Sequence, residues 1–107
     1  MTTGSIRFFD TPTGAVAFGS VALHLNPIDD VAIAKTPISP GVVLKREGAP
    51  DVVLNQFVAS GHKFAVNDVE TDAPLRRYGQ IIGFATQPIR AGDHVHTHNL
   101  AVEAFDR

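Results

Sequence analysis

A short sequence pattern centred on glycine recurs three times in this chain, and of all its sequence features this one most limits the possible folds. We call this pattern the glycine frame. In each copy an aliphatic residue is followed three positions later by glycine and three positions later again by an apolar residue, at 38–44, 58–64 and 89–95. Because glycine adopts a positive φ without a steric penalty, each copy can turn the chain sharply between two apolar anchors. Three such corners predict a compact β structure whose strands fold over one another.

The glycines of this frame are unequally spaced. Gly41 and Gly61 are separated by 20 residues, and Gly61 and Gly92 by 31. A solenoid repeat needs a constant period, so this spacing argues against one. We therefore interpret the frame as a turn device and not as a duplication.

Short apolar runs lie between the corners, at residues 21–25, 31–34, 52–54, 64–66 and 81–85. They are rich in β-branched residues and soon closed by Pro, Gly or Asn, whereas a helix in a globular protein needs roughly ten residues or more. The sequence therefore predicts an all-β fold, with one small domain over residues 21–107.

Residues 1–20 are expected to form an N-terminal extension. This segment has no clear hydrophobic period, so it either supplies one strand or docks on a partner. Residues 100–105 are expected to form a last turn or the start of a tail toward another subunit.

Composition excludes several classes of function. A formal net charge of −2, with nine scattered Lys and Arg residues, gives no basic surface for nucleic acid. No apolar run approaches the roughly 20 residues of a membrane-spanning helix, so we expect no membrane partner and a cytoplasmic location. Because the chain has no cysteine, a bound metal ion would need nitrogen and oxygen ligands.

Three of the five histidines lie within five residues, at His94, His96 and His98. If this segment is extended, the three imidazoles project from one face about 6.5–7 Å apart. Such a face suits metal binding or proton transfer, because imidazole is a common metal ligand and titrates near neutral pH. The alternative is a solvated strand end with three unconnected histidines.

His62 and Lys63 follow the second glycine directly. If the second and third corners are built alike, His62 corresponds to Asp93 and Lys63 to His94, and the polar groups form one cationic cluster. That cluster suits a carboxylate substrate, alone or with a divalent metal, and a lysine near other cations could have a lowered pKa and act as a base. A solvated strand lysine is the alternative.

Arg77 and Tyr78 belong to a further polar run. Arginine can bind a carboxylate through two hydrogen bonds, and tyrosine adds a hydroxyl, so the run could orient a sugar acid. The alternative is a surface turn with Tyr78 packed on the core. His24 is expected to be a satisfied, partly buried histidine, and Asp29 is expected to form a turn with its neighbour and not an acid–base pair.

Together these segments resemble the N-terminal, SAF-type domain of the altronate and galactarate dehydratase family. The resemblance runs from about residue 23 to residue 100. It is carried by residues 30–34, 61–65, 77–79, 82–85 and 89–99, which include GHK, YG-x-x-IG and HVHTHN in that order. It implies a β-clip fold, and the histidine-rich segment places the chain nearer the altronate or sulfolactate branch.

The resemblance also implies an activity. The family eliminates water from sugar acids with a divalent metal such as iron, manganese or magnesium, because the enolate-like intermediate concentrates negative charge on the carboxylate. The residues carried over by motif are His62 and Lys63 as catalytic residues; Arg77, Tyr78 and Gly79 as substrate-binding residues; and His96, His98 and His94 as metal ligands. Within the histidine segment we favour His96 and His98, and expect His94 to be merely exposed.

A complete dehydratase of this family has a large second portion that a 107-residue chain lacks. We therefore expect a separately encoded small subunit or an excised domain, with a large catalytic subunit as partner and a small sugar acid as substrate. Self-assembly into a homo-oligomer stays open. The alternatives are the small subunit of a sulfolactate sulfo-lyase, or a non-catalytic module that binds sugar acids or serves as a scaffold.

Overall fold

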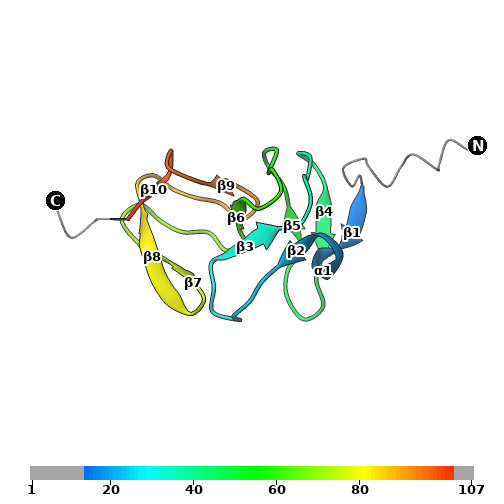
Figure 1. The fold of residues 1–107 in the computed structure, drawn as a ribbon, viewed down its shortest axis with the longest axis horizontal. Coiled ribbons are helices and arrows are strands. Elements are labelled where there is room, and N and C mark those ends of the chain that lie inside the picture. The colour runs from blue at the N-terminus through cyan, green and yellow to red at the C-terminus, as the bar shows by residue number, and fades with distance from the viewer. Residues whose placement is uncertain (1–13, 103–107) are drawn as a thin grey trace, which may run out of the picture.

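The structure, a computed structural model, describes residues 14–102, and its regular elements are nearly all strands. This confirms the predicted all-β fold. The elements in chain order are β1 (Ala15–Ala17), α1 (Phe18–Val21), β2 (Ala22–Leu23), β3 (Val31–Ala34), β4 (Val43–Lys45), β5 (Val52–Val53), β6 (Lys63–Ala65), β7 (Pro74–Arg77), β8 (Gln80–Ala85), β9 (His94–Val95) and β10 (Leu100–Ala101). The short strands are folded over one another (Figure 1).

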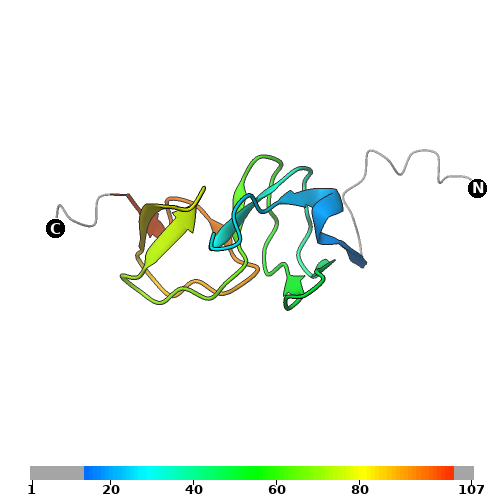
Figure 2. The ribbon, with the colours of Figure 1, turned by 90° about the horizontal axis from the view of Figure 1, so that it is seen from below.

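Three small sheets follow one another along the molecule. The four-stranded sheet β2-β3-β6-β9 lies in the middle, with β1-β4-β5 at one end and β10-β8-β7 at the other (Figure 1), and the view turned by 90° shows the same succession (Figure 2). Neighbouring strands are antiparallel except for β1 and β4, which pair in parallel. The middle sheet joins the two ends through β3, β6 and β9.

The three glycine corners are confirmed. Gly41, Gly61 and Gly92 have φ values of +87°, +82° and +96°, the left-handed region that glycine enters without penalty. The apolar anchors before and after each glycine are inaccessible to solvent; they are Ile38, Leu44, Val58, Phe64, Ile89 and Val95. Each corner therefore joins two buried anchors, as the sequence pattern predicts.

A fourth corner of the same kind has aspartate in place of glycine. Val69 and Leu75 are its buried anchors, and Asp72 between them has a φ of 70°. The Asp72 amide donates to the Ala85 carbonyl at 2.7 Å, just as the Gly41 amide donates to the Leu54 carbonyl at 2.7 Å. The glycine pattern in the sequence could not reveal this corner.

With the fourth corner included, the backbone repeats every 31 residues. Gly41 is followed by Asp72 at this interval, and Gly61 by Gly92. The hydrogen bond from the Ala34 amide to the carbonyl of residue 62 recurs 31 residues later, and so does the isolated bridge between residues 38 and 58, at 69 and 89. The interpretation of the frame as a turn device and not a duplication is therefore wrong, because Asp72 concealed the second copy.

Strand β6 belongs to both copies of this repeat. It ends the first copy, over residues 31–65, and begins the second, over residues 62–96. Phe64 packs in the apolar cluster beneath the first copy, and Ala65 packs in the cluster beneath the second. The two cores thus meet at adjacent residues of one strand.

Of the expected N-terminal extension, residues 1–13 lie outside the described residues, as do residues 103–107 of the expected tail. Within residues 14–20, β1 pairs with β4, and Phe18 is buried with its ring centroid 6.0 Å from that of Phe64. No helix among residues 14–102 is long and apolar enough to span a membrane.

Candidate metal and anion site

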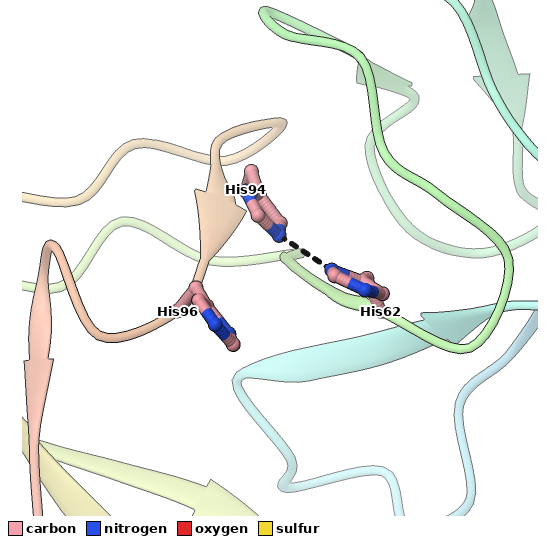
Figure 3. A group of neighbouring side chains, drawn as sticks. All are labelled: His62, His94 and His96. Carbon is pink, nitrogen blue, oxygen red and sulfur yellow. Dashed lines mark hydrogen bonds between the residues drawn. The ribbon is translucent and has the colours of Figure 1, made fainter.

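The rings of His62, His94 and His96 lie against one another on one face of the middle sheet (Figure 3). His62 Nδ1 lies 3.1 Å from His94 Nε2, so one of the two nitrogens donates to the other. One ring nitrogen from each of the three histidines lies within 4.8 Å of the others. The expected histidine cluster is therefore formed, with His62 as a full member.

The repeat explains why these side chains meet. His62 directly precedes β6 and His94 begins β9, and these strands are antiparallel neighbours in which Phe64 lies opposite His94. Because β6 and β9 are equivalent strands of the two copies, Lys63 and His94 occupy equivalent positions. The predicted correspondence of the second and third corners is confirmed.

The histidine segment is not extended throughout. Strand β9 ends at Val95, and the amides of Asn99 and Leu100 donate to the His96 carbonyl at 3.1 and 3.0 Å, which closes a turn over residues 96–99. The prediction of a strand through His98 is wrong, because the buried side chain of Asn99 bonds the backbone of the segment and ends the strand. His98 still lies with its ring centroid 5.6 Å from that of His94.

His94 is the half-buried member of the cluster, whereas His96 and His98 are exposed. The expectation that His94 is merely exposed is therefore wrong, because its ring lies against those of His62, His96 and His98. Burial, followed by the neighbouring imidazoles, lowers the pKa of His94 below its ordinary value of 6.5. This keeps the ring neutral near pH 7, the form that can bind a metal ion.

Lys63 lies half-buried on β6. Burial is the main cause that lowers the pKa of Lys63 from 10.5, and the positive charge of Arg77 adds to it. The lowered pKa agrees with the expectation from the sequence, although burial outweighs the neighbouring cations. None of the ion pairs described within residues 14–102 includes Lys63 or Arg77.

Arg77, at the end of β7, is held against its neighbour. Its Nη2 donates to the Tyr78 hydroxyl at 2.7 Å, and its guanidinium carbon lies 4.4 Å from the centre of the Tyr78 ring. The Arg77 Nε is buried and has no hydrogen-bond partner among the described residues. Tyr78 is 56 % exposed, so the alternative in which it packs on the core is wrong.

Asp29 contributes to this region in a way that the sequence did not indicate. Its carboxylate is buried and accepts the amides of Tyr78 and Gly79, both at 2.8 Å. No local sequence signal distinguishes such a carboxylate from an ordinary turn aspartate, because its partners lie about 50 residues away. His24 Nε2 lies 2.8 Å from the Asp29 carbonyl, which confirms a satisfied, half-buried histidine.

The candidate site is an open surface. The described chain encloses no pocket at the histidines or at Arg77. The structure thus brings His62, His94, His96 and His98 together, and it links Lys63 electrostatically to both His94 and Arg77. Tyr78 and Gly79 lie on the hairpin that carries Arg77.

The chain is similar in sequence to several known proteins. Residues 20–103 match the altronate/galactarate dehydratase SAF domain. The chain is 47 % identical over 55 residues to the altronate dehydratase of Escherichia coli K12, and 40 % identical over 45 residues to subunit alpha of the (2R)-sulfolactate sulfo-lyase of Chromohalobacter salexigens. It is 35 % identical over 49 residues to the altronate dehydratase of Bacillus subtilis 168.

These matches cover 51, 42 and 46 % of this chain, respectively. They cover 11 % of the E. coli dehydratase, 48 % of the sulfo-lyase subunit and 10 % of the B. subtilis dehydratase. The chain therefore spans less than two thirds of these relatives. Because the family match extends over most of its length, the protein belongs to the family of altronate/galactarate dehydratase SAF domains.

Proposed function

We propose that this chain is the small subunit or N-terminal domain of a lyase that eliminates water from a sugar acid, with a site completed by a large catalytic subunit. The observation that carries this proposal is the pair of cations formed by Lys63 and Arg77. Both are partly buried, they repel each other, and no described acid neutralises either of them.

An anionic substrate would reduce the repulsion between Lys63 and Arg77. A buried donor without a partner costs free energy, and the Arg77 Nε is such a donor. A carboxylate could accept hydrogen bonds from the Arg77 guanidinium and place its negative charge near Lys63. The carboxylate of a sugar acid meets both requirements.

The histidines fit the divalent metal that the family implies. His62, His94 and His96 each offer a ring nitrogen in one small group, and the lowered pKa of His94 favours the neutral ligand. Nitrogen donors suit iron better than magnesium or manganese, which prefer oxygen, so iron is our choice among the three. When bound, the metal would supply positive charge to the developing enolate and to the leaving hydroxyl.

Lys63 is our candidate base. Elimination breaks the C–H bond next to the carboxylate and the C–O bond of the neighbouring hydroxyl; hydroxide leaves with a proton as water, and the enol becomes a 2-keto acid. Because its pKa is lowered, Lys63 more readily offers a neutral amine for the first proton. His98, whose ring lies beside His94 but outside the group of three metal ligands, could deliver the proton that the leaving hydroxide needs.

A large subunit is part of the proposal because the site is open. Ligand sites bury about 70–90 % of a small ligand, and the described surface encloses no pocket. The sulfo-lyase relative is named as a subunit, and both dehydratase relatives extend far beyond the matched region. A second polypeptide surface over Lys63 and the histidines would complete the enclosure.

The test is to purify the chain together with the large lyase subunit encoded in the same genome and to measure 2-keto acid formed from altronate and galactarate. We expect Lys63→Met to lower kcat by about 100-fold or more, as for loss of a positioned base. Lys45→Met is the matched control, since Lys45 pairs with Asp51 on a hairpin that carries none of the candidate site residues. Full activity of a His62→Ala, Lys63→Ala double variant would contradict the site assignment.

One relative supports a second candidate reaction. The matched region covers 48 % of the sulfo-lyase subunit, a far larger share than for either dehydratase. The same cations could bind sulfolactate, with sulfite as the leaving group. Release of sulfite from sulfolactate, without turnover of sugar acids, would establish this alternative, whereas tight sugar-acid binding by the isolated chain without turnover in any mixture would indicate a binding module.

A further inference from the structure

Two polar side chains are buried within residues 14–102. Asp29 is 1 % exposed and Asn99 is 4 % exposed. A buried polar group costs free energy unless its hydrogen bonds are satisfied, so its partners show which part of the fold it stabilises. Each of these two side chains forms hydrogen bonds with the backbone of a segment that carries candidate site residues.

Asp29 lies beneath the turn at Tyr78 and Gly79. Its Oδ2 accepts the Tyr78 amide and its Oδ1 accepts the Gly79 amide, and both residues have positive φ values, of 58° and 72°. Hydrogen bonds to a carboxylate are stronger than neutral ones, so they can hold this conformation at a non-glycine residue. Because Tyr78 accepts a hydrogen bond from the Arg77 guanidinium, the turn also fixes Arg77.

Asn99 lies beneath the histidine segment. Its Nδ2 donates to the His94 carbonyl at 2.8 Å, and its Oδ1 accepts the His96 amide at 2.9 Å. Both donor and acceptor are thus used on the backbone of two residues whose rings belong to the cluster. A bond at each end of this segment sets the direction in which the two imidazoles project.

We propose that Asp29 and Asn99 are positioning residues for separate parts of the site. Asp29 would act on the substrate anion through Arg77, and Asn99 would act on the metal ion through His94 and His96. These two roles rest on the proposed function above. Each buried side chain affects the binding of one ligand without contacting that ligand.

The experiment compares Asp29→Asn, Asn99→Ala and a control in the full chain assembled with its large subunit. Asp51→Asn is the control, because Asp51 accepts a backbone amide on the equivalent hairpin, from Arg46 at 3.3 Å, but is exposed. The probes are Co²⁺ alone and galactarate alone, each titrated by calorimetry. Asn99→Ala should weaken Co²⁺ binding about tenfold, as loss of an outer-shell partner does, and leave galactarate binding unchanged.

Asp29→Asn should show the opposite pattern. We expect galactarate binding to weaken about tenfold, in line with the loss of a charge-assisted hydrogen bond, and Co²⁺ binding to stay unchanged. Asp51→Asn should alter neither affinity. Equal weakening of both ligands by both variants, or no weakening by either, would overturn the assignment of separate positioning roles.

Amide hydrogen exchange in the unmutated chain tests the Asp29 support without any variant. The Gly79 amide should exchange about tenfold more slowly than the amide of Gly48, which occupies the equivalent turn without a buried carboxylate beneath it. Equal exchange at the two glycines would overturn the role of Asp29, whatever the chain binds. If the complex with the large subunit binds neither probe and Gly79 still exchanges slowly, the proposed function is refuted but the role of Asp29 in supporting the turn is not.

Discussion

The two hairpins related by the 31-residue repeat, β4–β5 and β7–β8, begin with the same strand register but differ in how their polar side chains are paired. In the β4–β5 hairpin, Arg46 Nε donates to the Pro50 carbonyl at 2.8 Å, and Lys45 pairs with Asp51 at 2.9 Å. In the β7–β8 hairpin, the equivalent Nε of Arg77 is buried without a partner. The first hairpin is satisfied within itself, whereas the second leaves a donor for something else to bind.

The strands that follow the second and third corners, at Gly61 and Gly92, differ from the strand one repeat earlier at one position. Lys63 on β6 and His94 on β9 are equivalent, and burial is the main cause that lowers the pKa of each. The equivalent residue one repeat earlier, Ala32 on β3, is apolar and buried. The same strand position thus occurs on β3, β6 and β9, and a titratable side chain occupies it only on β6 and β9.

The largest expected effect separates two equivalent glycines. A Cβ at Gly92 would lie 1.9 Å from the Val53 carbonyl oxygen, whereas a Cβ at Gly61 meets nothing within 4 Å. Gly92→Ala should therefore cost about 3 kcal/mol or more, and Gly61→Ala only the strain of a positive φ, about 1–2 kcal/mol. Denaturant unfolding of both variants measures this; equal losses would show that the two corners are not packed differently.

The next comparison concerns the two equivalent arginines. Arg46→Gln should lower the free energy of unfolding by about 1 kcal/mol, because it removes the bond to Pro50 and the contact with the Phe18 ring. Arg77→Gln removes an exposed bond to the Tyr78 hydroxyl and the contact with the Tyr78 ring, but it also removes a buried Nε donor that has no partner among the described residues. Because losing an unsatisfied buried donor offsets part of the cost, Arg77→Gln should cost less than Arg46→Gln while weakening anion binding. A larger stability loss at Arg77 than at Arg46 would indicate that Arg77 serves the fold.

The pH dependence of stability tests the burial of His94. In the unfolded chain His94 has its ordinary pKa of 6.5, and in the folded chain the pKa is lower. As the pH falls below 6.5 the unfolded chain binds the proton first, so the free energy of unfolding decreases until the folded form is protonated too. The free energy of unfolding is measured by denaturant unfolding at pH 8 and at pH 5, with a chelator present to remove metal ions. It should decrease less for His94→Gln than for the original chain. An equal decrease in both would show that another group is responsible for the pH dependence.

The smallest effect is expected at the fourth corner. Asp72 has the positive φ that glycine has at the other three corners. Asp72→Gly relieves backbone strain, but it adds freedom to the unfolded chain and removes the contacts of an exposed side chain. These effects nearly offset one another, so the free energy of unfolding should change by less than about 1 kcal/mol. Thermal unfolding gives the value, and a large loss would show that the aspartate side chain itself holds this corner.

The sequence was sufficient where the signal was local. Glycine at a positive φ between two buried anchors predicted three corners, and the correspondence of Lys63 with His94 followed from aligning two of them. The fourth corner was not predicted, because an aspartate in the sequence does not indicate a positive φ as a glycine does. The repeat therefore stayed invisible in the sequence.

The site was predicted less completely, because its geometry depends on contacts between distant residues. Asn99 ends the histidine strand early through bonds to the backbone of His94 and His96. The half-buried state of His94 depends on a ring that lies 32 positions earlier in the chain, that of His62. Hydrophobic periodicity describes neither kind of contact.

Strand β6 links the folding of the two ends of the molecule. Phe64 is covered by one apolar cluster and Ala65 by the other, and the backbone of β6 pairs with β3 on one side and β9 on the other. If either end opened alone, it would expose one face of this strand and break half of its hydrogen bonds. Residues 14–102 should therefore unfold in a single cooperative transition, and His62 and Lys63 lie at the segment that would be the last to open.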